Sequence, residues 1–526
     1  MSRPSDHFDS DQPVVQPRLG FVGYLRFFWR QLTSMRTALF LLLLLAIAAI
    51  PGSLVPQVSS DPNGVVQYKL EYPDLSKVLD FLQVFTTYSS VWFSAIYLLL
   101  FVSLIGCVIP RTKHHLVALL AKPPKTPARL ERLAGFTSET SDADAATAVE
   151  TARDVLRKQG YRVEQYGDSV SAERGYLRET GNLVFHTALI GVLVTVGIGG
   201  GFGYTGQKVV VEGKSFVNTL GGYDSFNPGR FFTEAALQPF SLHLDKFTAV
   251  YEDKNFNAYG QAIDYTASVT TALRGAAPEK QQIKVNSPLE IGGTQVYLLG
   301  NGYAPVLTIR DPDGNIVWSQ PTPFLPQDAK LTSLGVIKIP DGLSEQLGMI
   351  GFLYPTTIPL QSGALASSHP DLLDPTVTLE VYTGDLGLDD GVARNAYNLD
   401  LTNLTQIAGR KAESPTIELG LGDRVDLPGG IGSIELTAIP RFASLDIHHD
   451  PSQVWVLVFA ILVLGGLLTS LFIPRRRVWV KVVPVKGGGI RLEYAGLARG
   501  EDPNLAAAVT EIAQKHADQL SLRLKP

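Results

Sequence analysis

Four stretches of the chain are apolar for about as long as a helix needs to cross a membrane. They are residues 37–56, 91–109, 182–203 and 454–473, and charged positions lie on either side of each. A bilayer interior about 30 Å thick requires about 20 helical residues, because a helix rises about 1.5 Å per residue and satisfies its own backbone hydrogen bonds. The pattern therefore predicts a polytopic α-helical membrane protein with four transmembrane helices.

An aromatic and basic stretch, residues 21–32, precedes the first span and suits a helix that lies in the membrane interface. Ala46-Ile47-Ala48 within that span resembles the cleavage site of a signal peptide. A signal peptide begins with a short charged region, whereas 36 residues precede this span. We therefore expect an uncleaved first transmembrane helix.

The positions of lysine and arginine orient the spans. Close to the span ends, 17 of these residues belong to the two termini (1–36 and 474–526) and to the loop 110–181, and five belong to the segments 57–90 and 204–453. Cytoplasmic loops carry an excess of positive charge. We therefore expect both termini and the loop 110–181 in the cytoplasm, and the other two segments outside it.

The long segment 204–453 predicts a large, mostly-β, sandwich-like domain, because apolar and polar positions alternate and turn sequences such as 311–314 separate the apolar stretches. Residues 343–411 are richer in Ser, Gly and Asp clusters, and we interpret them as a loose insertion. In the cytoplasmic loop, a helical pattern at 146–159 followed by two strand patterns predicts a small α/β insertion. The tail predicts a further helix at 504–517.

Composition excludes several classes of protein. The net charge of −5 gives no bulk electrostatic basis for binding nucleic acid. Cys107 is the only cysteine, which rules out an intrachain disulfide, a Cys-x-x-Cys redox centre, a thiolate-rich metal site and covalent haem attachment to this chain. No Ser/His/Asp arrangement or carboxylate pair is readable, so we expect no catalytic residue.

His186 lies in the third span, where an ionisable side chain is costly and is therefore a candidate for function. By the orientation above, it lies in the cytoplasmic half of the bilayer. A neutral imidazole there can ligate a metal such as haem iron, relay a proton, or bond to a neighbouring helix. The residues alone leave these three alternatives open.

The remaining candidates are weaker. His448 and His449 precede the fourth span at its outer end, where they form either an exposed turn or a contact to haem or metal. His114 and His115 follow the second span, and a basic interfacial cluster explains them without a ligand. The glycine-rich run 199–203 ends a membrane span with no strand before it, so it indicates close helix packing or an irregular helix end, not a phosphate loop.

Short motifs occur in this order at residues 34–57, 92–93 followed by 103–111, 172–175 running through 181 to 185–186, 285–289 with 296–297, and 450–451. Taken together, they resemble the ResB family of cytochrome c biogenesis proteins, which acts in the system II pathway. The likeness touches all four spans, the cytoplasmic insertion and the outer domain. Gly52-Ser53 stands where Gly-Thr is usual in the family.

The resemblance implies a role and a set of partners. His186 matches the span-three histidine proposed as an axial ligand of haem b, which is held transiently during transport; the metal is bound only through the haem iron. The partners would be a tryptophan-rich polytopic protein of the ResC or CcsA type that supplies the other ligand, an apocytochrome c, and a thioredoxin-like thiol reductant of the ResA type. The location would be the bacterial cytoplasmic membrane. His448 and His449 match no family histidine.

By the same resemblance the chain is expected to be inactive alone and to be a required subunit of a holocytochrome c synthase. Two rival hypotheses come from other classes. One is a membrane sensor or assembly scaffold whose outer β-domain binds a protein. The other is a transporter or proton channel, which would need more polar groups within the membrane than the spans contain.

Overall fold

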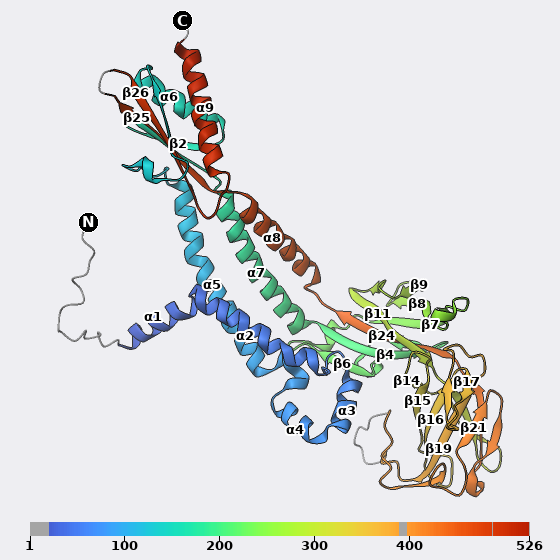
Figure 1. Cartoon of the computed structure of the whole chain (residues 1–526). Coiled ribbons are helices and arrows are strands. Elements are labelled where there is room, and N and C mark those ends of the chain that lie inside the picture. Colours follow the sequence, from blue (N-terminus) through green and yellow to red (C-terminus); the bar gives the residue numbers. More distant parts are fainter. Residues whose placement is uncertain (1–19, 389–396, 486–487, 525–526) are drawn as a thin grey trace. The chain divides into compact units, whose positions relative to one another are not determined.

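The computed structural model describes residues 20–388, 397–485 and 488–524. The chain forms two compact units (Figure 1). The helical unit combines Met1–Gly197 with Ser452–Pro526, and the β-unit is Ile198–Pro451. The helical unit contains the apolar helices and a domain of mixed helices and strands, and each unit is described by itself below.

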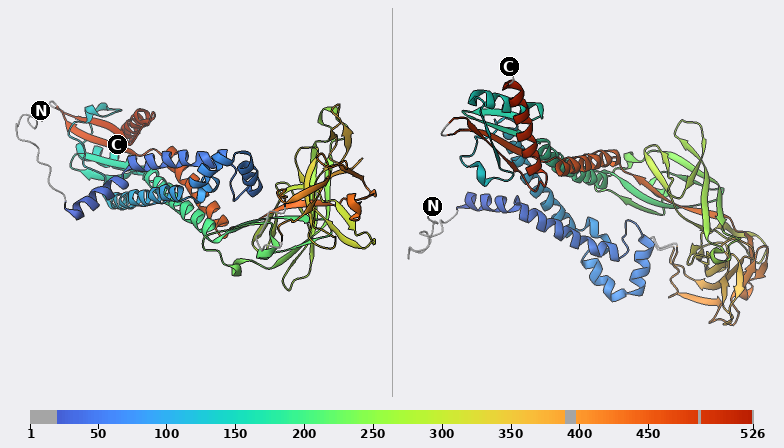
Figure 2. Two further views of the ribbon diagram at one scale, coloured as in Figure 1. Left: turned by 90° about the horizontal axis from the view of Figure 1, so that it is seen from below. Right: turned by 45° about the horizontal axis from the view of Figure 1, so that its top comes forward.

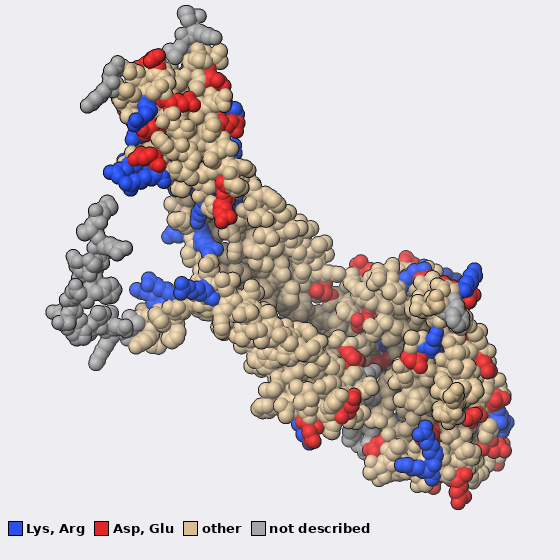
Figure 3. Space-filling view, viewed as in Figure 1, with Lys and Arg blue, Asp and Glu red and all other residues tan. Residues whose placement is uncertain are grey.

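Four helices in the described residues are long and apolar enough to cross a membrane, as the sequence predicted. Space-filling Figure 3 shows α8 (Gln453–Phe472) and the part of α7 (Leu177–Phe202) that follows Glu179 as a tan area without charged residues. Two of the four are longer than predicted: α5 continues through Pro110 into the basic stretch after it, and α7 begins before Glu179. The four are α2 (Met35–Leu54), α5 (Val91–Leu120), α7 (Leu177–Phe202) and α8 (Gln453–Phe472).

The aromatic helix α1 (Phe21–Leu32) has the predicted bounds and ends beside the middle of α5. Ser103 Oγ donates to Leu32 O at 2.6 Å, and Cys107 Sγ lies 2.9 Å from Thr33 O. Between them, a Cβ on Gly106 would lie 2.1 Å from Thr33 Cγ2. The only cysteine of the chain is thus part of a close helix contact.

The segment between α2 and α5 contains helices that the sequence analysis did not expect: α3 (Pro62–Glu71), α4 (Pro73–Phe81) and the 3₁₀ helix η1 (Val84–Ser89) (Figure 2). Buried Gln57 joins the two ends of this segment. Its Nε2 donates to Val84 O at 2.9 Å, and its Oε1 accepts from Thr87 N at 3.0 Å. An amide can satisfy both backbone groups at once, because it carries a donor and an acceptor.

The α/β domain is built from two distant parts of the chain. Its antiparallel sheet has the order β1-β26-β25-β3-β2, so strands from the C-terminal tail lie at its centre. The predicted insertion is therefore not a domain by itself, because its strands pair with residues from the tail. Its elements are β1 (Thr137–Ser141), α6 (Ala145–Lys158), β2 (Arg162–Tyr166), β3 (Ser169–Arg174), β25 (Arg476–Pro484), β26 (Ile490–Ala498) and α9 (Leu505–Leu524).

Helices α6 and α9 pack together with this sheet in one hydrophobic core, which encloses a histidine. His516 of α9 is fully buried: Nε2 donates to Ala148 O at 2.9 Å, and Nδ1 lies 2.8 Å from the Tyr494 hydroxyl. Burial lowers the pKa of His516 to about 4, although the hydrogen bond to Ala148 opposes this. The folded domain therefore requires a neutral imidazole.

This histidine predicts a loss of stability in acid. An unfolded chain protonates His516 near pH 6.5, whereas the folded chain resists protonation down to about pH 4. The stabilisation is present above pH 6.5 and is lost as pH falls to 4, with an upper bound on the order of 3 kcal/mol. Hydrogen exchange of α6 and α9 amides, corrected for intrinsic rates, measures it. In a His516→Leu variant the drop in protection should be smaller, and an equal drop would contradict the prediction.

The first lobe of the β-unit contains two antiparallel sheets that share one hydrophobic core. The sheet orders are β10-β11-β24-β4-β6 and β5-β7-β8-β9. The strands are β4 (Tyr204–Val211), β5 (Ser215–Val217), β6 (Ser225–Pro228), β7 (Phe240–Tyr251), β8 (Ala262–Leu273), β9 (Glu279–Lys284), β10 (Leu289–Ile291), β11 (Thr294–Tyr303) and β24 (Arg441–His449). This lobe confirms the mostly-β prediction.

The second lobe corrects one expectation, because the stretch 343–411 is not loose. It supplies β16 (Leu347–Tyr354) and β19 (Thr376–Gly384), the two central strands of a six-stranded sheet, and Met349 and Leu379 are fully buried there. The sheet orders are β13-β12-β23-β22, β14-β15-β16-β19-β20 with β21 beside β19, and β17-β18. Residues 389–396 lie outside the described residues.

The strands of this lobe are β12 (Val306–Arg310), β13 (Ile316–Pro321), β14 (Leu325–Pro326), β15 (Ser333–Ile339), β16 (Leu347–Tyr354), β17 (Thr357–Pro359), β18 (Leu365–Ser367), β19 (Thr376–Gly384), β20 (Leu404–Ala408), β21 (Ile417–Gly420), β22 (Arg424–Asp426) and β23 (Ser433–Ala438). The four-stranded and six-stranded sheets enclose one core. The predicted single sandwich is thus a pair of two-sheet lobes.

Candidate functional site

His186 lies in the third turn of α7 with its ring half-buried. Its Nδ1 is 2.8 Å from Asn182 O, one turn earlier in the same helix. A carbonyl oxygen only accepts, so Nδ1 carries the proton and Nε2 of the neutral ring keeps its lone pair. Metal-binding histidines show this same arrangement, in which the second ring nitrogen is fixed by a hydrogen bond to a backbone oxygen. The side chain is thus chemically fit to ligate a metal through Nε2.

Glycines fix which face of α7 packs on α8. A Cβ on Gly181 would lie 2.8 Å from Gly466 O, and a Cβ on Gly466 would lie 2.6 Å from Phe185 N. Ten residues after Gly181, a Cβ on Gly191 would lie 2.3 Å from the Phe459 ring. The absence of side chains lets the two backbones approach closely, as in other membrane helix pairs.

The opposite face of α7 carries the candidate site. Successive helical residues turn by about 100°, so positions 179, 182, 183 and 186 form one stripe (Glu179, Asn182, Leu183 and His186). That stripe is centred roughly 165° away from the glycine face. His186 therefore points away from α8 and shares its face with a carboxylate and an amide.

A cluster of ion pairs lies at the start of this stripe. Both oxygens of Glu179 are engaged: Oε1 by Arg499, and Oε2 by Arg475. His115 from α5 also reaches Glu179, with Nδ1 3.3 Å from Oε2, while its Nε2 lies 3.0 Å from Thr180 Oγ1. His115 is 5% exposed and is thus buried against α7, whereas the sequence analysis assigned it only to a basic interfacial cluster.

Glu173, at the end of β3, is the second anion of the cluster. It is 3% exposed, and its Oε1 accepts from Arg475 Nη2 at 2.7 Å and from Arg477 Nε at 2.9 Å. Its Oε2 accepts from the Tyr176 hydroxyl at 2.7 Å. Burial opposes ionisation, but the hydrogen bonds from these three partners outweigh it and hold the pKa of Glu173 below its usual value. The carboxylate is therefore charged at neutral pH.

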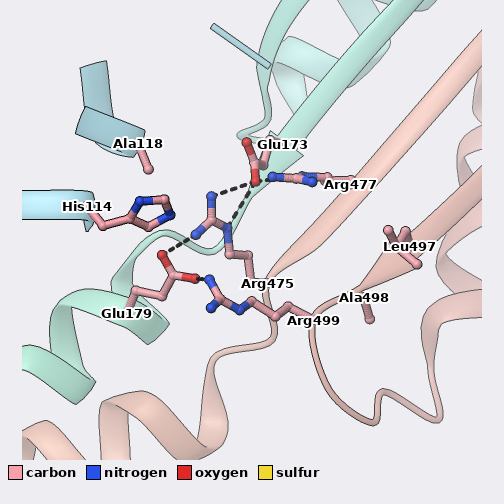
Figure 4. Close-up of a pocket in the computed structure, with 9 residues that line it drawn as sticks. All are labelled: His114, Ala118, Glu173, Glu179, Arg475, Arg477, Leu497, Ala498 and Arg499. Carbon is pink, nitrogen blue, oxygen red and sulfur yellow. Dashed lines mark hydrogen bonds and ion pairs between the residues drawn. The ribbon is translucent and has the colours of Figure 1, made fainter. Parts of the chain in front are cut away.

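Two adjoining pockets open beside these ion pairs. The smaller, about 280 Å³, is lined by Glu173, Glu179, Arg475 and Arg477 among others, and Figure 4 shows Arg475 between the two carboxylates. The larger, about 550 Å³, is lined by Arg111 and His114 from α5, by Arg499, and by Glu179, Asn182 and Leu183 of the stripe. His114, Glu179 and Arg499 line both. The larger pocket thus ends one helical turn from His186.

The structure places the two other candidate histidines on strand β24 of the β-unit, not in a turn. His448 Nε2 is 2.7 Å from Asp446 Oδ2. His449 Nδ1 donates to Gly293 O at 2.9 Å, which leaves Nε2 with a lone pair, and its ring stacks on Tyr204 with centroids 5.3 Å apart. The two histidines are thus held by different partners. A ligand role for either residue stays a prediction.

The glycine run 199–203 forms the last turn of α7 and the one-residue link to β4. Gly203 N donates to Gly199 O at 2.7 Å, and a Cβ on Gly203 would lie 2.6 Å from His449 O. The close approach is thus to strand β24 at the end of the helix, which agrees with the alternative of an irregular helix end. No group of three or more His, Cys, Asp or Glu residues suited to a metal ion occurs among the described residues.

Comparison with known proteins identifies the family. Residues 35–510 match the model of the ResB-like family, so the chain belongs to that family of membrane proteins. Three relatives are each named cytochrome c biogenesis protein CcsB. The one from Synechococcus sp. (strain WH7803) is 28% identical over 51% of this chain and 58% of its own length.

The relative from Gloeobacter violaceus is 27% identical over 56% of this chain and 63% of its own length. The match thus spans less than two thirds of either of these two proteins. The relative from Prochlorococcus marinus (strain NATL2A) is 24% identical, over 90% of this chain and 96% of its own length. The likeness therefore extends across both units of the chain.

Proposed function

We propose that the chain acts in cytochrome c biogenesis, where it holds haem b in the membrane through His186 and helps to deliver it to apocytochrome c outside the cytoplasm. The second axial ligand would come from a tryptophan-rich polytopic partner of the ResC or CcsA type. A thioredoxin-like reductant would keep the apocytochrome thiols reduced. Thioether formation belongs to the haem vinyl groups and those thiols, so this chain contributes ligation and orientation.

The geometry of His186 carries this proposal. Its Nε2 keeps a lone pair, and its helix face is free of the α8 contact that occupies the opposite face. An imidazole in an apolar helix is costly unless it has a partner. Haem iron accepts a neutral imidazole as an axial ligand, and the intrahelical hydrogen bond fixes the ring for that purpose.

The pairing of β3 with β25 supports the proposed orientation. β3 ends just before α7 begins, and β25 begins just after α8 ends. Paired strands must lie on the same side of a membrane, so α7 and α8 would cross in opposite directions. The β-unit between them would then lie on the far side, which the lysine and arginine distribution places outside the cytoplasm.

An optical spectrum of the complex with its membrane partner tests the proposal. The wild type should show low-spin haem with two imidazole ligands. His186→Ala should lose haem by about tenfold or more, since loss of even a supporting group costs metal sites that much. Added imidazole should restore the spectrum, because it can occupy the position that the substitution opens.

His243→Ala is the matched control, because His243 lies on β7 of the β-unit with its Nδ1 2.9 Å from Ser215 Oγ. Its haem content should equal that of the wild type. If His186→Ala also keeps its haem and spectrum, His186 serves only to join helices. The sensor or scaffold hypothesis would then be favoured.

A further inference from the structure

The two pockets at the start of the α7 stripe carry an excess of positive charge. Their lining includes four arginines and two glutamates, which leaves two positive charges. Three of the arginines are held by the glutamates. Arg111 is different: among the described residues it has no carboxylate partner, and its Nη2 lies 3.7 Å from Met35 Sδ. An anion that enters the larger pocket therefore finds one cation whose charge is not already neutralised.

The same pocket is continuous with the His186 face. Asn182 and Leu183 line it, and Asn182 O is the acceptor of His186 Nδ1. Asn182 and His186 are four residues apart, so about 6 Å of helix axis separates them. A ligand whose centre is bound at His186 Nε2 would extend one edge into the pocket beside Arg111 and Arg499.

We propose that this pocket binds the carboxylate-bearing edge of the porphyrin whose iron His186 ligates. The inference rests on the proposed function and adds the residues that orient the ligand. A porphyrin with two carboxylates on one edge carries two negative charges, which match the excess charge of the lining. Arg111 binds one carboxylate and Arg499 lies beside the other, while Arg475 remains fixed between Glu173 and Glu179. The iron then faces His186 in a single orientation.

Metal-free protoporphyrin isolates this inference from iron ligation. The full chain in phosphatidylcholine nanodiscs is titrated with the diacid and with its dimethyl ester, and binding is read from porphyrin fluorescence. The diacid should bind at least about tenfold more tightly, because charge-assisted hydrogen bonds are lost in the ester. Arg111→Gln should remove most of this preference, and Arg499→Gln should reduce it.

Lys113→Gln is the matched control, because it removes the same charge two residues from Arg111 but does not line the pocket. It should keep the preference for the diacid. Equal binding of the diacid and the ester by the wild type, or no binding, would overturn the inference while the iron spectrum still tests His186 separately. Arg111-dependent retention of phosphatidylglycerol, without a preference for the diacid, would instead assign the pocket to a lipid phosphate.

Discussion

Glu173→Gln should destabilise the α/β domain by about 3–5 kcal/mol, the cost of breaking a buried ion pair by removing one partner. The substitution keeps the size of the side chain but removes the negative charge that Arg475 and Arg477 share. Both guanidinium groups would then face each other across a neutral amide. Thermal unfolding of the detergent-solubilised chain, monitored by protease cleavage of the α/β domain, measures the loss of stability.

Glu164→Gln provides the comparison, because Glu164 lies on β2 of the same sheet and pairs with the exposed Lys122 at 2.7 Å. Exposed pairs contribute at most about 1 kcal/mol. The unfolding temperature of this variant should stay near that of the wild type. Equal stability of both variants would mean that Glu173 and its arginines contribute no more than a surface pair.

Gly466→Leu should separate α7 from α8 at a cost of about 3 kcal/mol, the upper range for overpacking a close contact. The first side-chain atom alone would lie 2.6 Å from Phe185 N and 2.7 Å from Gly181 O. These are backbone atoms, which cannot move aside as a flexible side chain can. Unfolding in a series of sodium dodecyl sulfate concentrations measures the loss of helix association.

The neighbouring glycine is the natural control. A Cβ on Gly465 meets nothing within 4 Å, so Gly465→Leu adds the same side chain to the same turn without a clash. Its unfolding should resemble that of the wild type. If both variants unfold alike, membrane insertion of the leucine, and not the fit between the helices, decides the result.

The four apolar helices could be predicted because each is encoded by one continuous stretch of sequence. The regular strand structure of the second β-lobe could not be predicted. β16 contains Gly348 and Gly351, which resemble loop residues in the sequence. In the structure a Cβ on Gly348 would lie 2.9 Å from Leu399 Cδ2, and one on Gly351 would lie 2.2 Å from Thr378 O. These glycines are required by dense packing, which depends on strands far away in sequence.

The candidate site likewise contains residues that the sequence predicts and residues that it does not. His186 was recognisable because an imidazole is rare in an apolar span. His115 was not, because its partner Glu179 is 64 residues further along the chain. In the sequence, the number of arginines after α8 indicated only the membrane orientation. No residue near Arg475 in the sequence indicated that it is buried against Glu173, which lies 302 residues earlier. A buried position for a charged residue becomes visible only when its partner is known.

The central strand of the α/β sheet, β25, is made about 300 residues after its neighbour β3. During synthesis, β1, β2 and β3 would therefore wait without their partners while the whole β-unit is translated and two more helices are inserted. At roughly 5–20 residues per second this interval lasts tens of seconds. If α7 and α8 cross a membrane, the sheet can close only when the second helix has returned the chain to the side on which β3 lies. Until β25 arrives, the edge of β3 would stay unpaired, and an unpaired strand edge is a site where another chain can add.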